Sequence, residues 1–595
     1  MKRILTDKKL LTDQSFSIDS DKRLYPKCDS SVWLRSCDAE ILESLSGQIQ
    51  GQIPRWLNGS LMRNGPGKLE VGETKFQHLF DSAALIHKFN LKNGNVSYSN
   101  RFINSEYFKK NMTAKRIVST SYGTAVVPDP CHTIFQQVFS YFINDPINDN
   151  CNISIYPFGD EFYAFTESPI IHRIDIDSLQ TIGKRDIRDY IGIVNHTSHP
   201  HVAQDGSIFN LGLMIESHLV DYNIIHFPFG ENMFENASVV AKIPARWRMN
   251  PSYMHSFALT ENYYILIEQP LSISMVQSLK ARFLKKPLAS IFKWYKNQCT
   301  IFHVIRRDRS EDRYAFRSYP FFYLHTINAY EDHDNIVIDI CCYQDPSVLD
   351  CMYIEAMENM HSIENYSKMF RSRPLRFNLP LSKKTEPRHL SFPQNLKQIL
   401  SSLLKTSIEQ FLLKEQPNIA QIAPLSFNKE FWEDFESRYS VKNLINNKST
   451  NCRAYQLENG MIFCIPESLC DLGCETPRIN DKVFSGKTYR FFYAISSDVD
   501  AENPGTIIKV DTLQKEVLTW NENNVYPSEP IFVPSPEAKY EDDGVILSAI
   551  IWGGNDTNRV GLLVLCSRSM EELGRCTFET NGPVPKCLHG WFIAR

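Results

Sequence analysis

The sequence contains no run of 18 apolar residues, so it predicts no transmembrane helix. Its first residues, MKRILTDKKLLTDQ, are too highly charged for the apolar core of a signal peptide. The formal net charge is only -4 over 595 residues, and no run of Lys and Arg indicates the basic face that nucleic-acid binding requires. We therefore expect an intracellular protein without nucleic acid among its partners.

The cysteines lack the spacing of a disulfide framework. The chain has 15 of them, an odd number, and two, Cys341 and Cys342, are adjacent. No C-x-x-C pair faces a second one, as a zinc site would require. Reduced thiols in an intracellular protein are the simpler interpretation.

What the sequence does contain is a repeated pattern of strand, polar turn and strand. Hydrophobic residues make up 43% and aromatic residues 12% of the chain, enough to bury a large core. Asn93-Gly94 is a favourable hairpin turn. The pattern predicts an all-β protein, either a propeller or a large barrel. It is found in KFNLKNGNVSYSNRF (88–102), IIHRIDIDSLQTIGKRDI (170–187), IIKVDTLQKEVLTW (507–520) and LLVLCSRSMEELGRCTF (562–578).

Two stretches interrupt this pattern. Residues 380–427 include QNLKQILSSLLKTSIEQFLLKEQ, whose apolar spacing is helical, and we interpret them as a variable insertion. Residues 270–299 lie within a span that has no Asp or Glu between Glu268 and Asp308. Their apolar residues predict a basic amphipathic segment, which either lies in a membrane interface or packs on the core.

Histidine is clustered at one place, NHTSHPH (195–201), which contains His196, His199 and His201. No H-E-x-x-H motif and no two-histidine, one-carboxylate motif of recognisable spacing occurs among the 16 histidines. The proline between His199 and His201 favours an extended backbone at His199. From the residues alone, the cluster is either part of a metal site or a polar turn.

Short motifs spread over nearly the whole chain carry a family resemblance. They are LNGSLMRNGPG (57–67), HLFDSAALIHKF (78–89), FYAFTES (162–168), TSHPHVAQDGSIFNLG (197–212), PSYMHSFALTENY (251–263), FFYLHTINAYED (321–332), YPSEPIF (526–532), EDDGVILS (541–548) and CLHGWF (587–592). In type and order these motifs resemble the carotenoid cleavage oxygenases. CDLGCETPRI and NGPVPKCLHGWF resemble the insect isomerooxygenases within that family.

The resemblance implies a fold and a metal centre. The fold is a seven-bladed β-propeller with a helical and loop cap over its top face, formed by residues 1–595 as a single domain. One Fe(II) lies on the propeller axis, with O₂ as co-substrate, although four histidines would also suit zinc. The implied metal ligands are His199, His255, His325 and His589, and the implied carboxylates that orient them are Glu167, Glu475 and Glu529.

The activity implied by the resemblance is oxidative cleavage of a carotenoid. The insect-type motifs imply cleavage of the central 15,15′ double bond of a C40 carotenoid such as β-carotene or zeaxanthin. One retinoid aldehyde would leave as the all-trans isomer and the other as the 11-cis isomer, for visual chromophore production. Central or eccentric cleavage without isomerisation, and a non-redox retinyl ester isomerohydrolase, stay open as alternatives within the family. A propeller that binds without catalysis is expected to lose one of the seven residues of the centre.

The resemblance also implies contacts outside the metal centre. Tyr122 and Thr166 match positions that line the substrate tunnel. Residues 270–299 match the membrane-contact region, which implies a monotopic protein on the cytosolic face of the endoplasmic reticulum or another lipid surface. Cys131, in PDPC, matches a lipidated cysteine of a relative, but His132 follows it in this chain where that relative has Lys. The oligomeric state is not indicated.

Overall fold

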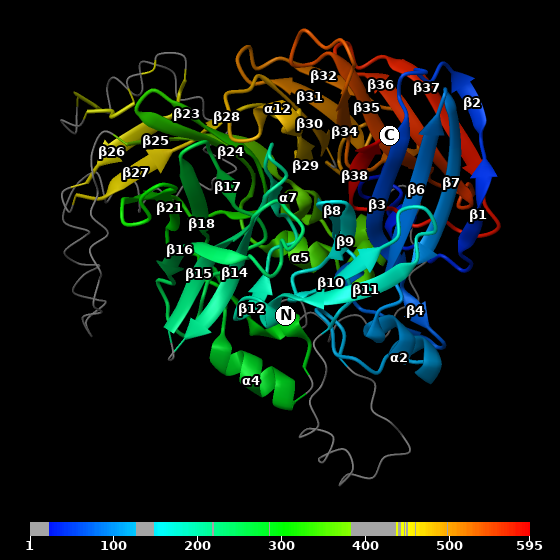
Figure 1. Cartoon of the computed structure of the whole chain (residues 1–595), viewed down its shortest axis with the longest axis horizontal. Coiled ribbons are helices and arrows are strands. Elements are labelled where there is room, and N and C mark those ends of the chain that lie inside the picture. The colour runs from blue at the N-terminus through cyan, green and yellow to red at the C-terminus, as the bar shows by residue number, and fades with distance from the viewer. Residues whose placement is uncertain are drawn as a thin grey trace.

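Seven sheets of four to six strands surround a common centre in the computed structural model (Figure 1). The all-β, seven-bladed propeller expected from the sequence is confirmed. The structure describes residues 23–125, 148–216, 219–284, 286–381, 436–437, 442–445, 447, 450–457, 460–496 and 498–595.

The first four blades begin in order along the chain, although blades 1 and 4 also contain strands from later in the sequence. In hydrogen-bonding order, blade 1 contains β1 (Ile41–Ser46), β7 (Asn95–Phe102), β6 (Ala83–Lys92), β3 (Gly59–Lys68) and β38 (His589–Ala594). Blade 2 contains β11 (Thr181–Asp186), β10 (Ile170–Ile174), β9 (Glu161–Phe165) and β8 (Ser154–Phe158). Blade 3 contains β12 (Ile193–His196), β14 (Ile208–Glu216), β15 (Leu219–Phe227) and β16 (Ser238–Pro244), with β13 (His201–Val202) beside β14. Blade 4 contains β17 (Ala258–Leu259), β18 (Tyr263–Glu268), β21 (Thr300–Arg306), β22 (Arg313–Ser318), β27 (Ile462–Ile465) and β26 (Arg453–Gln456).

The remaining three blades complete the ring. Blade 5 contains β23 (Phe322–Asp332), β24 (Asn335–Tyr343), β25 (Arg373–Pro380) and β28 (Glu467–Ser468). Blade 6 contains β29 (Glu475–Arg478), β30 (Phe491–Ser496), β31 (Thr506–Asp511) and β32 (Val517–Trp520). Blade 7 contains β2 (Gln48–Gly51), β37 (Glu572–Glu579), β36 (Arg559–Cys566), β35 (Gly544–Trp552) and β33 (Val525–Pro527), with β34 (Ile531–Pro534) on β35. Two short ribbons, β4 (Glu70–Val71) with β5 (Thr74–Lys75) and β19 (Leu271–Ile273) with β20 (Phe292–Trp294), lie outside the blades.

The ring is closed by strands from opposite ends of the chain. The last strand, β38, joins blade 1 by pairing with β3, where Asn64 faces His589. The early strand β2 joins blade 7 by pairing with β37. Because both closures are ladders of backbone hydrogen bonds, His589 enters the centre at a fixed register.

The Asn93-Gly94 turn forms as the sequence predicts. Both residues have positive φ, 52° and 81°, and they join β6 to β7 where Lys92 pairs with Asn95. Two positive φ angles in a two-residue loop are typical of a type I′ hairpin, whose twist matches that of the strands.

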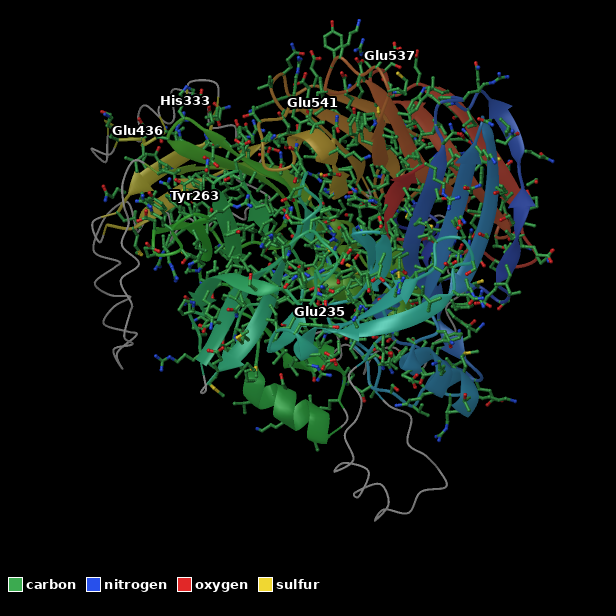
Figure 2. The ribbon with its side chains drawn as sticks, viewed as in Figure 1. Glu235, Tyr263, His333, Glu436, Glu537 and Glu541 are labelled. Atoms are coloured by element: carbon green, nitrogen blue, oxygen red, sulfur yellow. The ribbon has the colours of Figure 1, made fainter. Side chains whose placement is uncertain are left out.

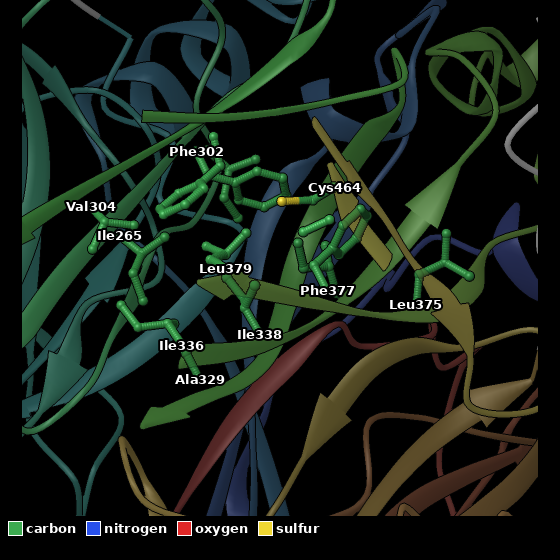
Figure 3. Packing of buried hydrophobic residues seen from close by; sticks show 14 of the residues in the cluster. Ile265, Phe302, Val304, Ala329, Ile336, Ile338, Leu375, Phe377, Leu379 and Cys464 are labelled. Atoms are coloured by element: carbon green, nitrogen blue, oxygen red, sulfur yellow. The ribbon is translucent and has the colours of Figure 1, made fainter. Parts of the chain in front are cut away.

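The apolar core lies between neighbouring blades. Its largest cluster brings together side chains of blades 4 and 5 (Figure 3). Phe302 on β21 has no exposed surface, and its ring lies 5.0 Å from that of Phe377 on β25, centroid to centroid. Polar residues such as Glu537 and His333 are exposed at the outer edge instead (Figure 2).

The described helices lie in the connections between strands. They are α2 (Glu106–Ala114), α4 (Met275–Phe283), α5 (Ser347–Cys351), α6 (Ile354–Glu358), α7 (Tyr366–Phe370) and α12 (Asp481–Phe484), with 3-10 turns η3 (Ser30–Trp33), η4 (Leu79–Asp81), η5 (Ile187–Asp189), η6 (Leu288–Ile291) and η7 (Met360–Ser362). None of the helices in the described residues is long and apolar enough to cross a membrane. Of the predicted insertion at 380–427, residues 382–427 lie outside the described residues.

The basic segment 270–299 is helical only in its first half. Helix α4 and turn η6 are carried on the ribbon formed by β19 and β20, in which Leu271 pairs with Trp294. Ile291 is buried, whereas Val276, Leu284 and Leu288 are 48%, 53% and 45% exposed. The ribbon therefore holds a short basic helix and a turn at the surface.

The packing between blades 4 and 5 predicts a large effect of truncating Phe302. We expect Phe302→Ala to lower the free energy of unfolding by about 3–5 kcal/mol, because it leaves a cavity in a close-packed cluster. The control Leu513→Ala alters a side chain that is 66% exposed and should change stability by less than about 0.5 kcal/mol. Urea unfolding followed by fluorescence measures both, and equal midpoints would contradict the assignment of this core.

Candidate metal centre

Four histidine rings converge at the centre of the propeller. The ring of His199 lies 4.7, 4.8 and 4.6 Å from the rings of His255, His325 and His589, centroid to centroid. The Nε2 atoms of His199 and His255 are 3.1 Å apart. One ring nitrogen of each of His199, His255 and His325 lies within 4.8 Å of the others, a spacing that could hold a metal ion.

Every blade contributes one residue to this centre or to its surroundings. The contributions in blade order are His589 on β38, Glu167 after β9, His199 between β12 and β13, His255 before β17, His325 on β23, Glu475 on β29 and Glu529 between β33 and β34. Six of the seven come from a strand at one end of its sheet, or from a connection to that strand. The seven-bladed arrangement therefore brings together residues that are spread over more than 400 positions of the sequence.

Each predicted glutamate accepts a hydrogen bond from one histidine ring at Nδ1. The distances are 2.6 Å from His255 to Glu167, 2.5 Å from His325 to Glu475 and 2.9 Å from His589 to Glu529. A carboxylate in this place fixes the ring's orientation and leaves Nε2 without a proton.

A distortion of β23 accompanies the position of His325. The pairing of β23 with β24 shifts register between Tyr323 and Thr326, on either side of His325. A bulge of this kind re-aims the side chain of the strand residue it contains. The Nε2 atom of His325 is buried and has no hydrogen-bond partner, as expected of a nitrogen that binds a metal ion.

Burial keeps the imidazoles of His199 and His589 neutral. Burial lowers the pKa of His589 to about 4, against the opposing charge of Glu529. Burial, followed by the charges of the other three histidines, holds the pKa of His199 well below its ordinary value. Burial alone would raise the pKa of Glu529, but the charges of Arg478 and His589 outweigh it and lower the pKa. Neutral rings and ionised carboxylates are the protonation states that metal binding requires.

The two other histidines of NHTSHPH point to different partners. His201 bonds through Nε2 to the carbonyl oxygen of Phe257, 2.9 Å away. His196 bonds through Nδ1 to the carbonyl oxygen of Thr197, 2.8 Å away, and its ring packs edge-on against Phe165. Only His199 of this cluster joins the converging rings.

The remaining predicted residues lie around the centre or outside the described part of the chain. The Tyr122 ring contacts those of His78 and Phe292, with centroids 4.6 and 5.8 Å apart. Thr166 is half-buried and immediately precedes Glu167. Cys131 lies outside the described residues.

Sequence reasoning missed the residues that hold the glutamates. The Tyr253 hydroxyl donates to Glu167 at 2.7 Å. Arg63 and Arg478 form ion pairs with Glu529 at 3.0 and 3.3 Å. All three residues lie inside motifs that carry the family resemblance (PSYMHSF, LMRNGPG and CETPRI), but nothing in their spacing indicates a shared partner.

Comparisons with known proteins agree with this fold. A family model described as RPE65, retinal pigment epithelial membrane protein, matches residues 34–594. The carotenoid isomerooxygenase of Drosophila melanogaster is 48% identical, over 97% of this chain and 95% of its own length. The beta,beta-carotene 15,15'-dioxygenase of Gallus gallus is 33% identical, over 93% of this chain and 96% of its own length. A cobalt-substituted Synechocystis ACO has a similar fold, with a TM-score of 0.68 at 18% identity, covering 95% of this chain and 99% of that one.

The hydrogen bond from His325 to Glu475 predicts an effect on metal affinity. We expect Glu475→Gln to weaken metal binding about 10- to 100-fold, because the ring loses the carboxylate that orients it. The control Glu331→Gln alters a carboxylate that accepts three hydrogen bonds from Thr260 and Asn262, away from the histidines. Competition with a chelator measures the affinities, and equal values for the two variants would contradict the role given to Glu475.

Proposed function

Because the chain belongs to the RPE65 family of carotenoid oxygenases, we propose that it cleaves a C40 carotenoid with O₂. The proposed reaction breaks the central 15,15′ double bond of a substrate such as β-carotene or zeaxanthin. One oxygen atom adds to each of the two carbons, which gives two retinoid aldehydes. One of these leaves as the all-trans isomer and the other as the 11-cis isomer, a precursor of visual chromophore.

The observation that carries the proposal is the complete set of four histidines and three glutamates, one residue from each blade. A propeller that only bound a ligand would have no need for four buried imidazoles whose free nitrogens converge. The isomerase half is supported by 48% identity to a carotenoid isomerooxygenase, against 33% to a carotene dioxygenase. No similar support favours the retinyl ester isomerohydrolase.

We propose Fe(II) as the metal, held by His199, His255, His325 and His589. Four neutral nitrogen donors leave the full dipositive charge on the ion. Iron bound in this way supplies redox chemistry toward O₂, which zinc cannot supply. The glutamates retain the protons at Nδ1 of three rings and thus keep each Nε2 directed to the centre.

Aromatic side chains extend from the centre toward the proposed substrate path. Tyr253 donates to Glu167, and its ring lies 5.3 Å from that of Phe292, which in turn contacts Tyr122. Burial, followed by nearby acidic groups, raises the pKa of Tyr122 well above its ordinary value, so its ring stays neutral. We assign Tyr122, with Thr166, to the walls that orient the polyene and exclude water, where ring faces stabilise positive charge that develops along it.

We further propose that residues 270–299 rest on the cytosolic face of the endoplasmic reticulum or another lipid surface. Lys280, Lys286, Lys293 and Lys296 are exposed, and the same segment exposes the apolar side chains of Val276, Leu284 and Leu288. Such a surface favours an anionic bilayer, from which an apolar carotenoid would be extracted. η6 is also bonded to the tunnel region, since Leu288 and Ala289 donate backbone hydrogen bonds to Ser121 and Tyr122.

The reaction is tested on protein purified anaerobically with Fe(II), given β-carotene in detergent and then O₂. We expect one 11-cis and one all-trans aldehyde for each carotenoid consumed, resolved by isomer-selective chromatography. His325→Ala should lose the activity with the metal, and Glu331→Gln should keep it. All-trans retinal alone would refute the isomerase half. Absence of cleavage with iron bound would refute the proposed reaction, and retinyl ester would be the next substrate to test.

Membrane contact is tested with vesicles that contain phosphatidylserine. We expect Leu284→Asp to weaken co-sedimentation about tenfold or more, because burial of one leucine contributes about 1.5–3 kcal/mol. The control Leu513→Asp changes a leucine that is 66% exposed, against 53% for Leu284, in the connection between β31 and β32, far from α4 in Figure 1. Equal binding of both variants would show that this segment does not contact lipid.

A further inference from the structure

Among the described residues, Glu529 differs from the other two glutamates of the centre in the charge of its partners. Glu529 forms ion pairs with two arginines in addition to His589. The ion pairs of Glu167 and Glu475 that the structure records are with His255 and His325 alone. Each of the three carboxylates therefore accepts a hydrogen bond from one histidine, but Glu529 also has two positively charged partners.

Arg63 is part of the framework that closes the ring. Its guanidinium is fully buried and also donates to the carbonyl oxygen of Leu588 at 2.5 Å and to Sγ of Cys587 at 3.3 Å. Gly590 allows this approach, because a Cβ there would lie 2.6 Å from Cδ of Arg63. Removing Arg63 would therefore disturb the pairing of β3 with β38 as well as Glu529.

Arg478, at the end of β29, contacts both Glu529 and the start of β38. Its Nε lies 3.3 Å from Oε1 of Glu529, the oxygen that His589 also uses. Its Nη2 donates to the carbonyl oxygen of Gly590 at 2.7 Å, and a long ion pair of 3.5 Å joins Nη1 to Asp481. Arg478 thus connects the start of β38 to blade 6 and places a positive charge beside the carboxylate that supports His589.

We propose that Arg478 is a positioning residue of the metal centre, which fixes Glu529 and His589 and makes His589 the least electron-donating of the three carboxylate-supported ligands. The inference rests on the proposed iron-dependent function. A carboxylate increases the donor strength of the imidazole to which it is bonded. A cation beside that carboxylate reduces this effect, and its own field opposes an increase of charge on the metal. Arg478 therefore favours Fe(II) over Fe(III).

The test compares Arg478→Met, which removes the charge, with Arg478→Lys, which keeps it. Arg568→Met is the matched control, since Arg568 is 55% exposed and pairs with the half-buried Asp543 in the strand connections of blade 7. Three readouts are taken on the full chain: Zn(II) affinity, the visible ligand-field spectrum of the Co(II) form, and the Fe(III)/Fe(II) midpoint potential from a mediated titration. Zinc has no redox chemistry, so its affinity reports how well the site is formed without any change of oxidation state.

We expect Arg478→Met to weaken Zn(II) binding by about 10-fold. This is the lower end of the loss in metal affinity that is typical when a residue supporting a metal ligand is removed. It should also shift the Co(II) bands and lower the midpoint potential. Arg478→Lys should restore the potential more fully than the zinc affinity, because it keeps the charge but loses the guanidinium Nη2 that donates to Gly590. Arg568→Met should match the wild type in all three.

An Arg478→Met protein with wild-type spectrum, affinity and potential would overturn the inference. A lower melting temperature together with unchanged metal readouts would also overturn it, because that is the result of a purely structural role. Failure of the wild-type protein to bind iron or to cleave carotenoid would instead refute the proposed function, and the two failures are therefore distinguishable.

Discussion

The structure of the centre depends on the hydrogen bond between a buried imidazole and a glutamate. Four rings whose centroids lie about 5 Å apart cannot all carry charge, and burial removes the water that would otherwise satisfy their nitrogens. In His255, His325 and His589, a carboxylate accepts a hydrogen bond from Nδ1 and so satisfies that nitrogen. It also keeps the single proton of each neutral ring on the side away from the centre. The glutamates have further partners in turn: Tyr253 donates to Glu167, Arg63 and Arg478 form ion pairs with Glu529, and the backbone N–H of Thr476 donates to Glu475.

The propeller suits this chemistry because it is closed. Each blade brings one residue to the centre, so the position of every ring is set by a separate sheet and by its packing on two neighbours. The closure of blade 1 by β38 places His589 opposite Asn64 at one fixed register. A slip of one residue would turn His589 to the other face of the strand. The ladder between β3 and β38 is thus a requirement of the metal centre as well as of the fold.

The surface segment and the centre are physically continuous. The β19–β20 ribbon carries α4 and η6 outward, and the same ribbon carries Phe292, which packs against Tyr253. Tyr253 donates to Glu167, the partner of His255. Phe292 and Tyr253 therefore connect this ribbon to the histidine cluster. The proposed membrane contact and the proposed chemistry therefore share one structural element.

Local physics in the sequence determined the strands, the Asn93-Gly94 hairpin and the helical spacing of α4, because these depend on neighbours within a few residues. The seven residues of the centre were assigned through family resemblance, since their spacing along the chain has no metal signature. The second half of 270–299 has apolar residues at helical spacing, yet the structure contains a 3-10 turn and a strand, because pairing of Phe292 with Ile273 prevails over local preference. Which carboxylate faces which ring, and that two arginines share Glu529, was decided only by the tertiary structure. Those contacts join residues such as Arg63 and Glu529 that are 466 positions apart, and no local rule brings such residues together.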